Sequence, residues 1–355
     1  MDEADSASRE PEEGTETAQD QRSPTPPPEK TYGELKIRFH VPLSRDSRNI
    51  FSVVFSPSGN ELVVGFGNGA VQSLKPATGK VIRDIFSGGV ARQATTSMCF
   101  HPTEPNYLIA VGAEGIISVY KTDVAKCIAT MKEEGNQLNA VDISSDGGYY
   151  ATGGKSRGIC IYDVKTNQVT HVLEPADYVT SGKDLQPIDG HSRRIYALRF
   201  HPQERHIFLS GGWDDSVKVW DKRMEKQARR VLNGPHICGP GIDIWDNKIL
   251  TASWVAQDAL QLWDFRRWEV EKNIPFLSRQ NQGDFLYAAR FCNRDIVMAG
   301  GSGTNSAKAI NHKTSEILGE IDLTNKAVQT LDSVLDGQYI AVAGVAGNLK
   351  IAYLV

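Results

Sequence analysis

The chain has 355 residues, of which 40% are hydrophobic, and its formal net charge is −4 at neutral pH. This length and composition predict a soluble globular protein with a substantial core, and no window approaches the roughly 18 apolar residues of a membrane-spanning helix. The charge also excludes the strongly basic footprint of a typical nucleic-acid-binding domain. We therefore expect that the protein neither binds a membrane nor contacts nucleic acid directly.

The cysteines are few, scattered and free of any C-x-x-C spacing: Cys99, Cys127, Cys160, Cys238 and Cys292. Their odd number is typical of thiols in a reducing compartment rather than of disulfides or a zinc site, and the histidines show no metal-ligand spacing either. The amino terminus, MDEADSASRE, has no apolar segment behind it and so lacks a secretory signal. We expect a cytoplasmic protein, with the nucleus as a second location, and no metal or cofactor.

Residues 1–31 come first in chain order and form an acidic segment. The first 30 positions carry nine acidic and three basic side chains and end in SPTPPPEK. This composition buries too little apolar surface to offset the entropy of ordering, so we predict a disordered tail. Ser23 and Thr25 each precede a proline and are candidate phosphorylation sites within it.

A repeated unit occupies residues 32–355. Each copy begins with an apolar strand and a turn, and most copies start about 42–46 residues apart. The seven copies are IFSVVFSPSG (50–59), TTSMCFHPTE (95–104), LNAVDISSDG (138–147), IYALRFHPQE (195–204), GIDIWDN (241–247), FLYAARFCNRD (285–295) and AVQTLDSVLDG (327–337). Three further short strands follow in each unit, except that the seventh ends after its third strand. Radially repeated four-stranded antiparallel units predict an all-β, seven-bladed propeller.

Ring closure can be predicted from two matching deficits. The seventh unit lacks a fourth strand, whereas the segment YGELKIRFHV (32–41) is a strand without a unit. The amino-terminal strand can therefore complete the last blade and remove an exposed sheet edge.

The fourth unit carries the clearest resemblance to a known family. Its sequence reads GHSRRIYALRF (190–200) and then FLSGGWDDSVKVWD (208–221), and it resembles the WD-repeat family of propellers. The resemblance extends over residues 32–355. It implies a hydrogen-bonded structural tetrad made by His191, Ser210, Asp214 and Trp220. A histidine, a hydroxyl and a carboxylate buried together must satisfy one another, and the indole N–H supplies the remaining donor.

The other units depart from this pattern. Unit five keeps Trp263, with Thr251 and His236 as possible partners, whereas units two and three carry Tyr120 and Tyr162 at the tryptophan position. We therefore expect these blades to depend mainly on apolar packing.

A nucleophilic triad is an alternative interpretation of the fourth unit. However, Ser210 lies within a predicted strand rather than on an exposed elbow, and Trp220 occupies space that a substrate would need. A propeller enzyme would also need convergent carboxylates in the central channel, and none could be aligned. We predict that the protein is not an enzyme.

Two further tryptophans suggest a partner-binding surface. Trp213 and Trp254 each stand three residues after the strand hydroxyl of Ser210 or Thr251, in the turn between second and third strands. Tryptophan is among the residues that most often anchor interfaces. The two rings either face a partner at the rim of the central opening or fold onto adjacent loops and cover the core.

Other residues are expected on the same face, which we call face A: the face formed by the turns between second and third strands and by the loops leading into each first strand. Lys155 takes the Trp213 position in unit three. Arg194 and Phe285 precede first strands, as do Gln137 and Lys326. Together they predict an aromatic and cationic patch suited to an acidic or aromatic peptide segment.

The longest connection, EPADYVTSGKDLQPIDG (174–190), opens onto face A and is either a specificity loop or a tolerated insertion. We predict a non-catalytic protein-interaction scaffold whose partners are proteins or peptide segments. The alternatives are a subunit of an RNA- or chromatin-associated assembly and a propeller enzyme. Salt-sensitive retention on RNA would favour the assembly, and turnover lost on mutation of a channel residue would favour the enzyme.

Overall fold

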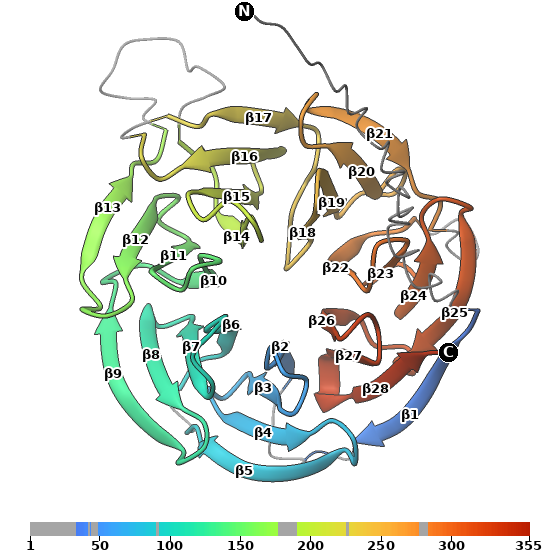
Figure 1. Cartoon of the computed structure of the whole chain (residues 1–355), viewed down its shortest axis with the longest axis horizontal. Coiled ribbons are helices and arrows are strands. Elements are labelled where there is room, and N and C mark those ends of the chain that lie inside the picture. The colour runs from blue at the N-terminus through green and yellow to red at the C-terminus, as the bar shows by residue number, and fades with distance from the viewer. Residues whose placement is uncertain are drawn as a thin grey trace, which may run out of the picture. The chain divides into compact units, whose positions relative to one another are not determined.

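The computed structural model describes residues 33–41, 43, 49–89, 92–176, 190–224, 227–276 and 283–355. It consists of seven four-stranded antiparallel sheets arranged as the blades of a ring (Figure 1). The all-β, seven-bladed architecture predicted from the sequence is confirmed. The predicted tail with Ser23 and Thr25, and residues 177–189 of the long loop, lie outside the described residues.

The strands fall into four concentric sets. The innermost strands are β2 (Ile50–Phe55), β6 (Thr95–Phe100), β10 (Leu138–Ile143), β14 (Ile195–Phe200), β18 (Ile242–Trp245), β22 (Leu286–Phe291) and β26 (Val328–Val334). The second strands are β3 (Leu62–Phe66), β7 (Tyr107–Gly112), β11 (Tyr149–Gly154), β15 (Ile207–Gly212), β19 (Lys248–Ala252), β23 (Ile296–Gly301) and β27 (Tyr339–Gly344).

The third strands are β4 (Val71–Lys75), β8 (Ile116–Lys121), β12 (Ile159–Asp163), β16 (Ser216–Asp221), β20 (Leu260–Asp264), β24 (Ser306–Asn311) and β28 (Leu349–Leu354). The outer strands are β5 (Lys80–Phe86), β9 (Lys126–Lys132), β13 (Val169–Leu173), β17 (Arg230–Asn233), β21 (Glu269–Asn273), β25 (Glu316–Asp322) and β1 (Leu35–Val41). A 3-10 turn, Val345–Gly347, completes the described secondary structure.

The last blade is closed by the amino-terminal strand, as predicted. β1 pairs antiparallel with β28, and the pairing runs from Leu35 opposite Leu354 to Val41 opposite Leu349. The two ends of the described chain are also joined by a 2.8 Å hydrogen bond from the Gly33 N–H to the Val355 carbonyl. Figure 1 shows the blue and red ends of the chain side by side in this blade. The pairing covers β28, which would otherwise be the exposed outer edge of a three-stranded blade.

Burial explains the composition of each set of strands. The second strands lie between neighbouring blades, so β3 (LVVGF) and β15 (IFLSGG) are buried at every position. The outer strand β9 (KCIATMK), in contrast, is exposed at five of its seven positions and buried at none. The core lies between adjacent blades, where Val63 of blade one packs in one cluster with Leu108 of blade two. Strands buried on both faces are expected to be continuously apolar.

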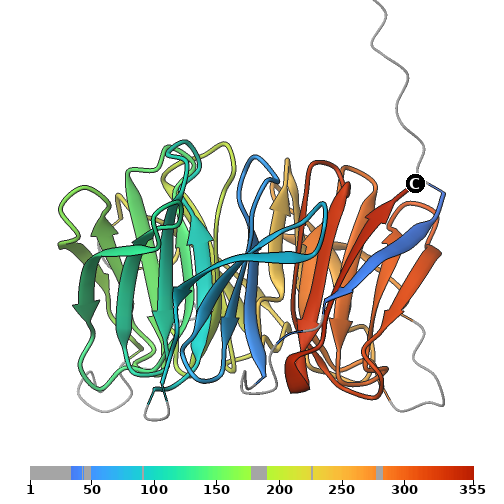
Figure 2. The same cartoon turned by 90° about the horizontal axis from the view of Figure 1, so that it is seen from below.

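The inner strands share a bulge that shapes the channel mouth. In six blades the pairing between the first and second strands shifts just after the first residue of the inner strand, as between Ile195 and Ala197. A bulge leaves one residue outside the ladder and redirects its side chain. In blade four that residue is Tyr196, which lines the central cavity. Figure 2 shows the blades from the side, with the strands running between two loop faces.

Candidate functional site

The four residues of the implied tetrad lie together in blade four. The Trp220 indole N–H donates to Ser210 Oγ at 2.7 Å, and Ser210 Oγ lies 2.6 Å from His191 Nε2. His191 Nδ1 in turn lies 2.8 Å from Asp214 Oδ2. One proton arrangement satisfies every group: indole to serine, serine to imidazole, and imidazole to carboxylate. Ser210 and His191 are fully buried, so the network belongs to the core and is closed to a substrate.

The charge of Asp214 is stabilised within this network. Burial opposes ionisation, but the hydrogen bonds from His191 and from the Ser192 N–H outweigh it, so the pKa of Asp214 is lowered. The backbone N–H of Ser192 donates to the same oxygen at 3.1 Å. The carboxylate therefore holds the loop that leads into β14 against the turn after β15.

Blade five retains only part of the tetrad. The Trp263 indole N–H donates to Thr251 Oγ1 at 3.0 Å. His236, which the sequence suggested as a further partner, instead places Nδ1 2.6 Å from Asp215 Oδ1 of blade four.

Blade three has a different network, which the sequence did not indicate. The hydroxyls of Thr152 and Tyr162 both donate to Glu133, at 2.5 and 3.0 Å, and the side-chain amide of Asn136 donates to it at 2.7 Å. A glutamate contributed by the loop before β10 therefore replaces the histidine.

A recurring backbone hydrogen bond defines equivalent positions on face A. In six blades, the residue after the second strand donates its N–H to the carbonyl of the residue that precedes the first strand. In blade five the donor is Trp254, two residues after β19, and the acceptor is His236, in the loop before β18. The pairs are Gly67–Asn49, Ala113–Ala94, Lys155–Gln137, Trp213–Arg194, Trp254–His236, Ser302–Phe285 and Val345–Ala327, with N···O distances of 2.8–3.3 Å.

This equivalence corrects two details of the sequence interpretation. His236 corresponds to Arg194 rather than to His191, which explains why it does not reach Thr251. In the seventh blade the position belongs to Ala327, one residue after Lys326. The positions of Trp213, Trp254 and Lys155 do match one another.

Trp213 belongs to a cluster at the channel mouth. Its ring centroid lies 5.1 Å from that of Tyr196, and the Arg194 guanidinium carbon lies 5.7 Å from the Trp213 ring centroid. The indole N–H points toward Cys238 Sγ at 3.1 Å. Burial raises the pKa of the Cys238 thiol, although this hydrogen bond opposes the shift. The side chain of Trp213 is still 43% exposed, so one face of the ring meets solvent.

Trp254 makes a second cluster with the next blade. Its ring centroid lies 5.0 Å from that of Phe285, and its indole N–H lies 3.4 Å from Ser302 Oγ. Trp254 is 40% exposed. Phe285 adopts a φ of +41°, a left-handed conformation that is costly for a bulky residue, and its N–H donates to the Val255 carbonyl. Both tryptophans therefore cover neighbouring loops with one face and expose the other.

The predicted patch residues lie on four consecutive blades, three to six. Arg194 joins Trp213, and Phe285 joins Trp254. Lys155 is exposed on blade three at the matching position. Tyr196 was missed by the sequence analysis, because its position depends on the bulge between Ile195 and Ala197.

The central channel contains a set of charged residues that the sequence analysis also missed. One position of the inner strands, read from the strand register, carries alternating charges on five consecutive blades: Asp142, Arg199, Asp243, Arg290 and Asp332. Of these carboxylates, Asp142 and Asp332 line a central cavity of about 220 Å³, whereas the sequence analysis could align none.

These carboxylates connect neighbouring blades. Asp142, Asp243 and Asp332 accept backbone N–H groups of the next blade, from Phe200, Phe291 and Phe55, at 2.7–2.8 Å. Arg199 Nε lies 2.8 Å from Asp243 Oδ1, and Arg290 Nε lies 3.4 Å from Asp332 Oδ1.

Burial has different net effects on these channel charges. It raises the pKa values of Asp142 and Asp332. It would lower the pKa of Arg199, but Asp243 and Asp142 outweigh it and raise that pKa. Within the part of the chain that the structure describes, no group of three or more His, Cys, Asp or Glu side chains could hold a metal ion.

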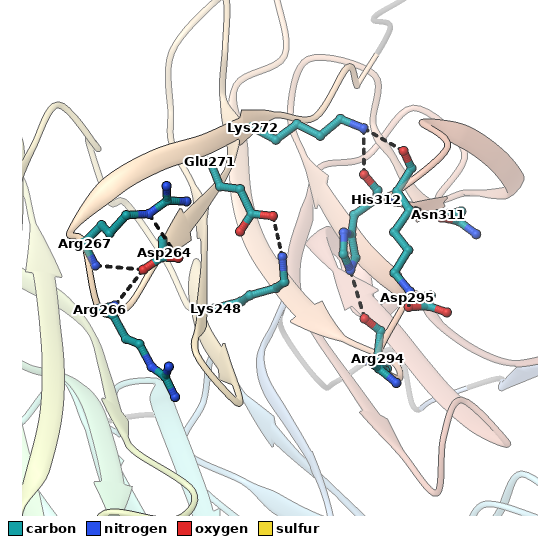
Figure 3. A network of polar contacts seen from close by, with 11 residues as sticks. Lys248, Asp264, Arg266, Arg267, Glu271, Lys272, Arg294, Asp295, Asn311 and His312 are labelled. Atoms are coloured by element: carbon teal, nitrogen blue, oxygen red, sulfur yellow. Dashed lines mark hydrogen bonds and ion pairs between the residues drawn. The ribbon is translucent and has the colours of Figure 1, made fainter. Parts of the chain in front are cut away.

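Basic side chains also gather on blades five and six, where they form ties within and between blades (Figure 3). Lys272 donates to the carbonyls of His312 and Lys313 in the neighbouring blade, at 2.8 and 3.0 Å. Lys248 pairs with Glu271 at 2.5 Å, and Arg267 lies 3.5 Å from Asp264. Lys248, Arg267 and Lys272 are therefore engaged in contacts within the protein.

The ring, its closure and the blade-four tetrad define a seven-bladed β-propeller built from WD-type units. A family model described as "WD domain, G-beta repeat" matches residues 125–163 and 182–221. The chain is a WD-repeat protein. Among the described residues, no helix is long and apolar enough to cross a membrane.

Curated relatives align over part of their length. A guanine nucleotide-binding protein subunit beta-like protein of Encephalitozoon cuniculi is 27% identical over 132 residues, which cover 37% of this chain and 36% of that protein. The target of rapamycin complex subunit LST8 of Mus musculus is 23% identical over 49% of this chain and 48% of its own. Pre-mRNA-processing factor 19 of Oryza sativa is 26% identical over 63% and 40%. The matched region thus spans about half or less of each of these relatives.

Proposed function

We propose that this protein is a non-catalytic scaffold that binds a segment of a partner protein on face A of blades three to six. The observation that carries the proposal is the pair of half-exposed tryptophans, Trp213 and Trp254, at equivalent positions of adjacent blades. Aromatic rings that are fixed on one face and exposed on the other lose little side-chain entropy when a partner covers them. The closed ring holds them in place before binding.

The charge of the patch favours an acidic or aromatic partner segment. Arg194 stacks on Trp213 and Lys155 stands on the next blade, so a carboxylate beside an apolar side chain would meet both kinds of group. Phe285 provides the apolar rim. The relatives support a role in assemblies, since LST8 is named as a subunit of a complex.

We also propose roles for the amino-terminal segment and for the location of the protein. Residues 1–31 would act as a disordered acidic tail that precedes the propeller domain, residues 32–355, in the sequence, and the protein would act in the cytoplasm or nucleus. A subunit of an RNA-associated assembly is the second candidate, because one relative is named as a pre-mRNA-processing factor.

The test is affinity capture from cell extract with the intact chain and a Trp213→Ala, Trp254→Ala double variant. Truncating a half-buried tryptophan also costs stability, so Trp268→Ala serves as the matched control. Trp268 is half-buried at a turn on the opposite loop face, where its ring centroid lies 4.7 Å from that of Phe265. Thermal melts establish that the three proteins are folded.

We expect a defined set of proteins to be captured by the intact chain and by Trp268→Ala and to be lost with the double variant. Arg194→Glu should weaken the same contacts and make them less sensitive to salt. Capture of the same set by the double variant would refute the site. Retention that depends on added RNA would instead favour the second candidate.

A further inference from the structure

Blade two lacks the tetrad and has a cavity where the tetrad lies in blade four. Strand register places Ala110 at the position of Ser210 and Tyr120 at the position of Trp220. Both replacements are smaller side chains. Glu114, in the turn after the second strand, accepts the Gln93 N–H at 2.8 Å. The space left between blades one and two is a cavity of about 290 Å³.

The cavity has apolar walls and a row of uncharged polar groups. Phe86, Val111 and Ile116 supply apolar surface. Ile116, Ser118 and Tyr120 alternate along β8, so their side chains point to the same side of the sheet. Tyr120 is 5% exposed, and burial raises the pKa of its phenol although a hydrogen bond to Ser118 opposes the shift. The phenol therefore stays neutral at physiological pH.

The charges at the mouth of the cavity compensate each other. Arg92 lies 3.3 Å from Glu114, and its guanidinium carbon is 5.5 Å from the centroid of the Phe86 ring. Because this pair is neutral overall, the cavity offers no charge to attract an anion or a cation. Its occupant should be uncharged and flat, with one polar group that reaches the hydroxyls of Ser118 and Tyr120.

The volume limits the occupant further. An apolar cavity of about 150 Å³ holds a benzene ring, and pockets for drug-sized ligands begin near 300 Å³. A cavity of about 290 Å³ therefore suits one ring, or two fused rings, with a polar tip. We propose that the blade-two cavity receives a tyrosine or tryptophan side chain from a partner protein. This site is separate from the tryptophan patch and does not depend on it.

Cys127 provides a direct reporter, since it lines the cavity and is exposed. The experiment measures the alkylation rate of Cys127 by N-ethylmaleimide in the full chain, using peptide mass spectrometry. The probes are N-acetyl-tyrosinamide, N-acetyl-tryptophanamide and N-acetyl-leucinamide. Either aromatic amide should slow alkylation at least threefold in a saturable way, while the rate at Cys160, on β12 of blade three, should not change.

The matched variant is Ala110→Leu, which fills the cavity from its inner wall and should abolish the protection. If its thermal melt shows that it does not fold, Ile116→Trp fills the cavity from the third strand instead. The proposal is overturned if neither aromatic amide protects Cys127, if the leucine amide protects it equally, or if a folded filling variant is still protected. Protection by free p-cresol alone would indicate a small-molecule site and would also overturn it.

Discussion

Replacing Ser210 with alanine tests whether the blade-four network stabilises the ring. Ser210 Oγ accepts the Trp220 indole N–H and contacts His191 Nε2, and all three residues are at most 1% exposed. Alanine fills nearly the same volume, so the main loss is polar. One buried N–H and one buried ring nitrogen lose their partner, each at about 1–3 kcal/mol. We expect the free energy of unfolding to fall by about 2–6 kcal/mol.

Thr251→Val in blade five is the matched control. Thr251 is also fully buried, but of the tetrad contacts its hydroxyl makes one, in which it accepts the Trp263 indole N–H. Valine keeps the shape and leaves one buried donor without a partner, so we expect a loss of about 1–3 kcal/mol. Both values come from urea unfolding curves with unchanged slopes. Exchange of the Trp220 indole proton, followed by NMR, should also become faster in Ser210→Ala and stay unchanged in Thr251→Val.

The reasoning fails if Ser210→Ala costs no more than Thr251→Val, or if the Trp220 indole proton exchanges at the wild-type rate. Either result would mean that His191 and Trp220 do not share the hydroxyl in solution.

Three further predictions concern stability in acid and closure of the ring. The pKa of Asp214 is lowered below its ordinary value of 3.8, so the ionised carboxylate stabilises the fold at neutral pH. This stabilisation is lost as the pH falls through the lowered pKa, and Asp214→Asn should remove the loss. The pKa of Asp142 is raised, so the folded protein takes up this proton more readily than the unfolded chain does. The wild type should therefore gain stability relative to Asp142→Asn as the pH falls toward 3.8. Urea unfolding midpoints between pH 7 and pH 3 measure both effects. A chain that starts at residue 42 lacks β1, and the loss of buried Leu35 and Val41 should lower its free energy of unfolding by about 3–6 kcal/mol. A chain that starts at Gly33 keeps β1 and should melt like the full chain. Equal melting of the two truncated chains would contradict the closure argument.

The blades were predictable because their signal is local. Each strand shows its own pattern within four to seven residues, and turn residues separate the strands, so the repeat and its closure by residues 32–41 follow from the sequence alone. The tetrad positions in blade four could also be assigned, because the motif is complete there.

The channel charges could not be predicted in the same way, because their partners lie on different blades. Asp142 and Arg199 each look like an isolated charge in a mainly apolar strand, and only the strand register puts them at the same height. His236 was misplaced for a similar reason, since the loop before β18 holds it at the Arg194 position. Tyr196 depends on a bulge, which the alternation of a strand does not reveal.

The pairing of β1 with β28 has a consequence for synthesis on the ribosome. β1 is among the first strands to emerge, yet its partner ends at Leu354, so it must wait while the intervening blades are made. At about 5–20 residues per second, this delay is about 15–60 s. During that time an unpaired strand is available to any other sheet edge. A factor that shields β1 during synthesis would therefore determine what fraction of the molecules fold into a closed ring.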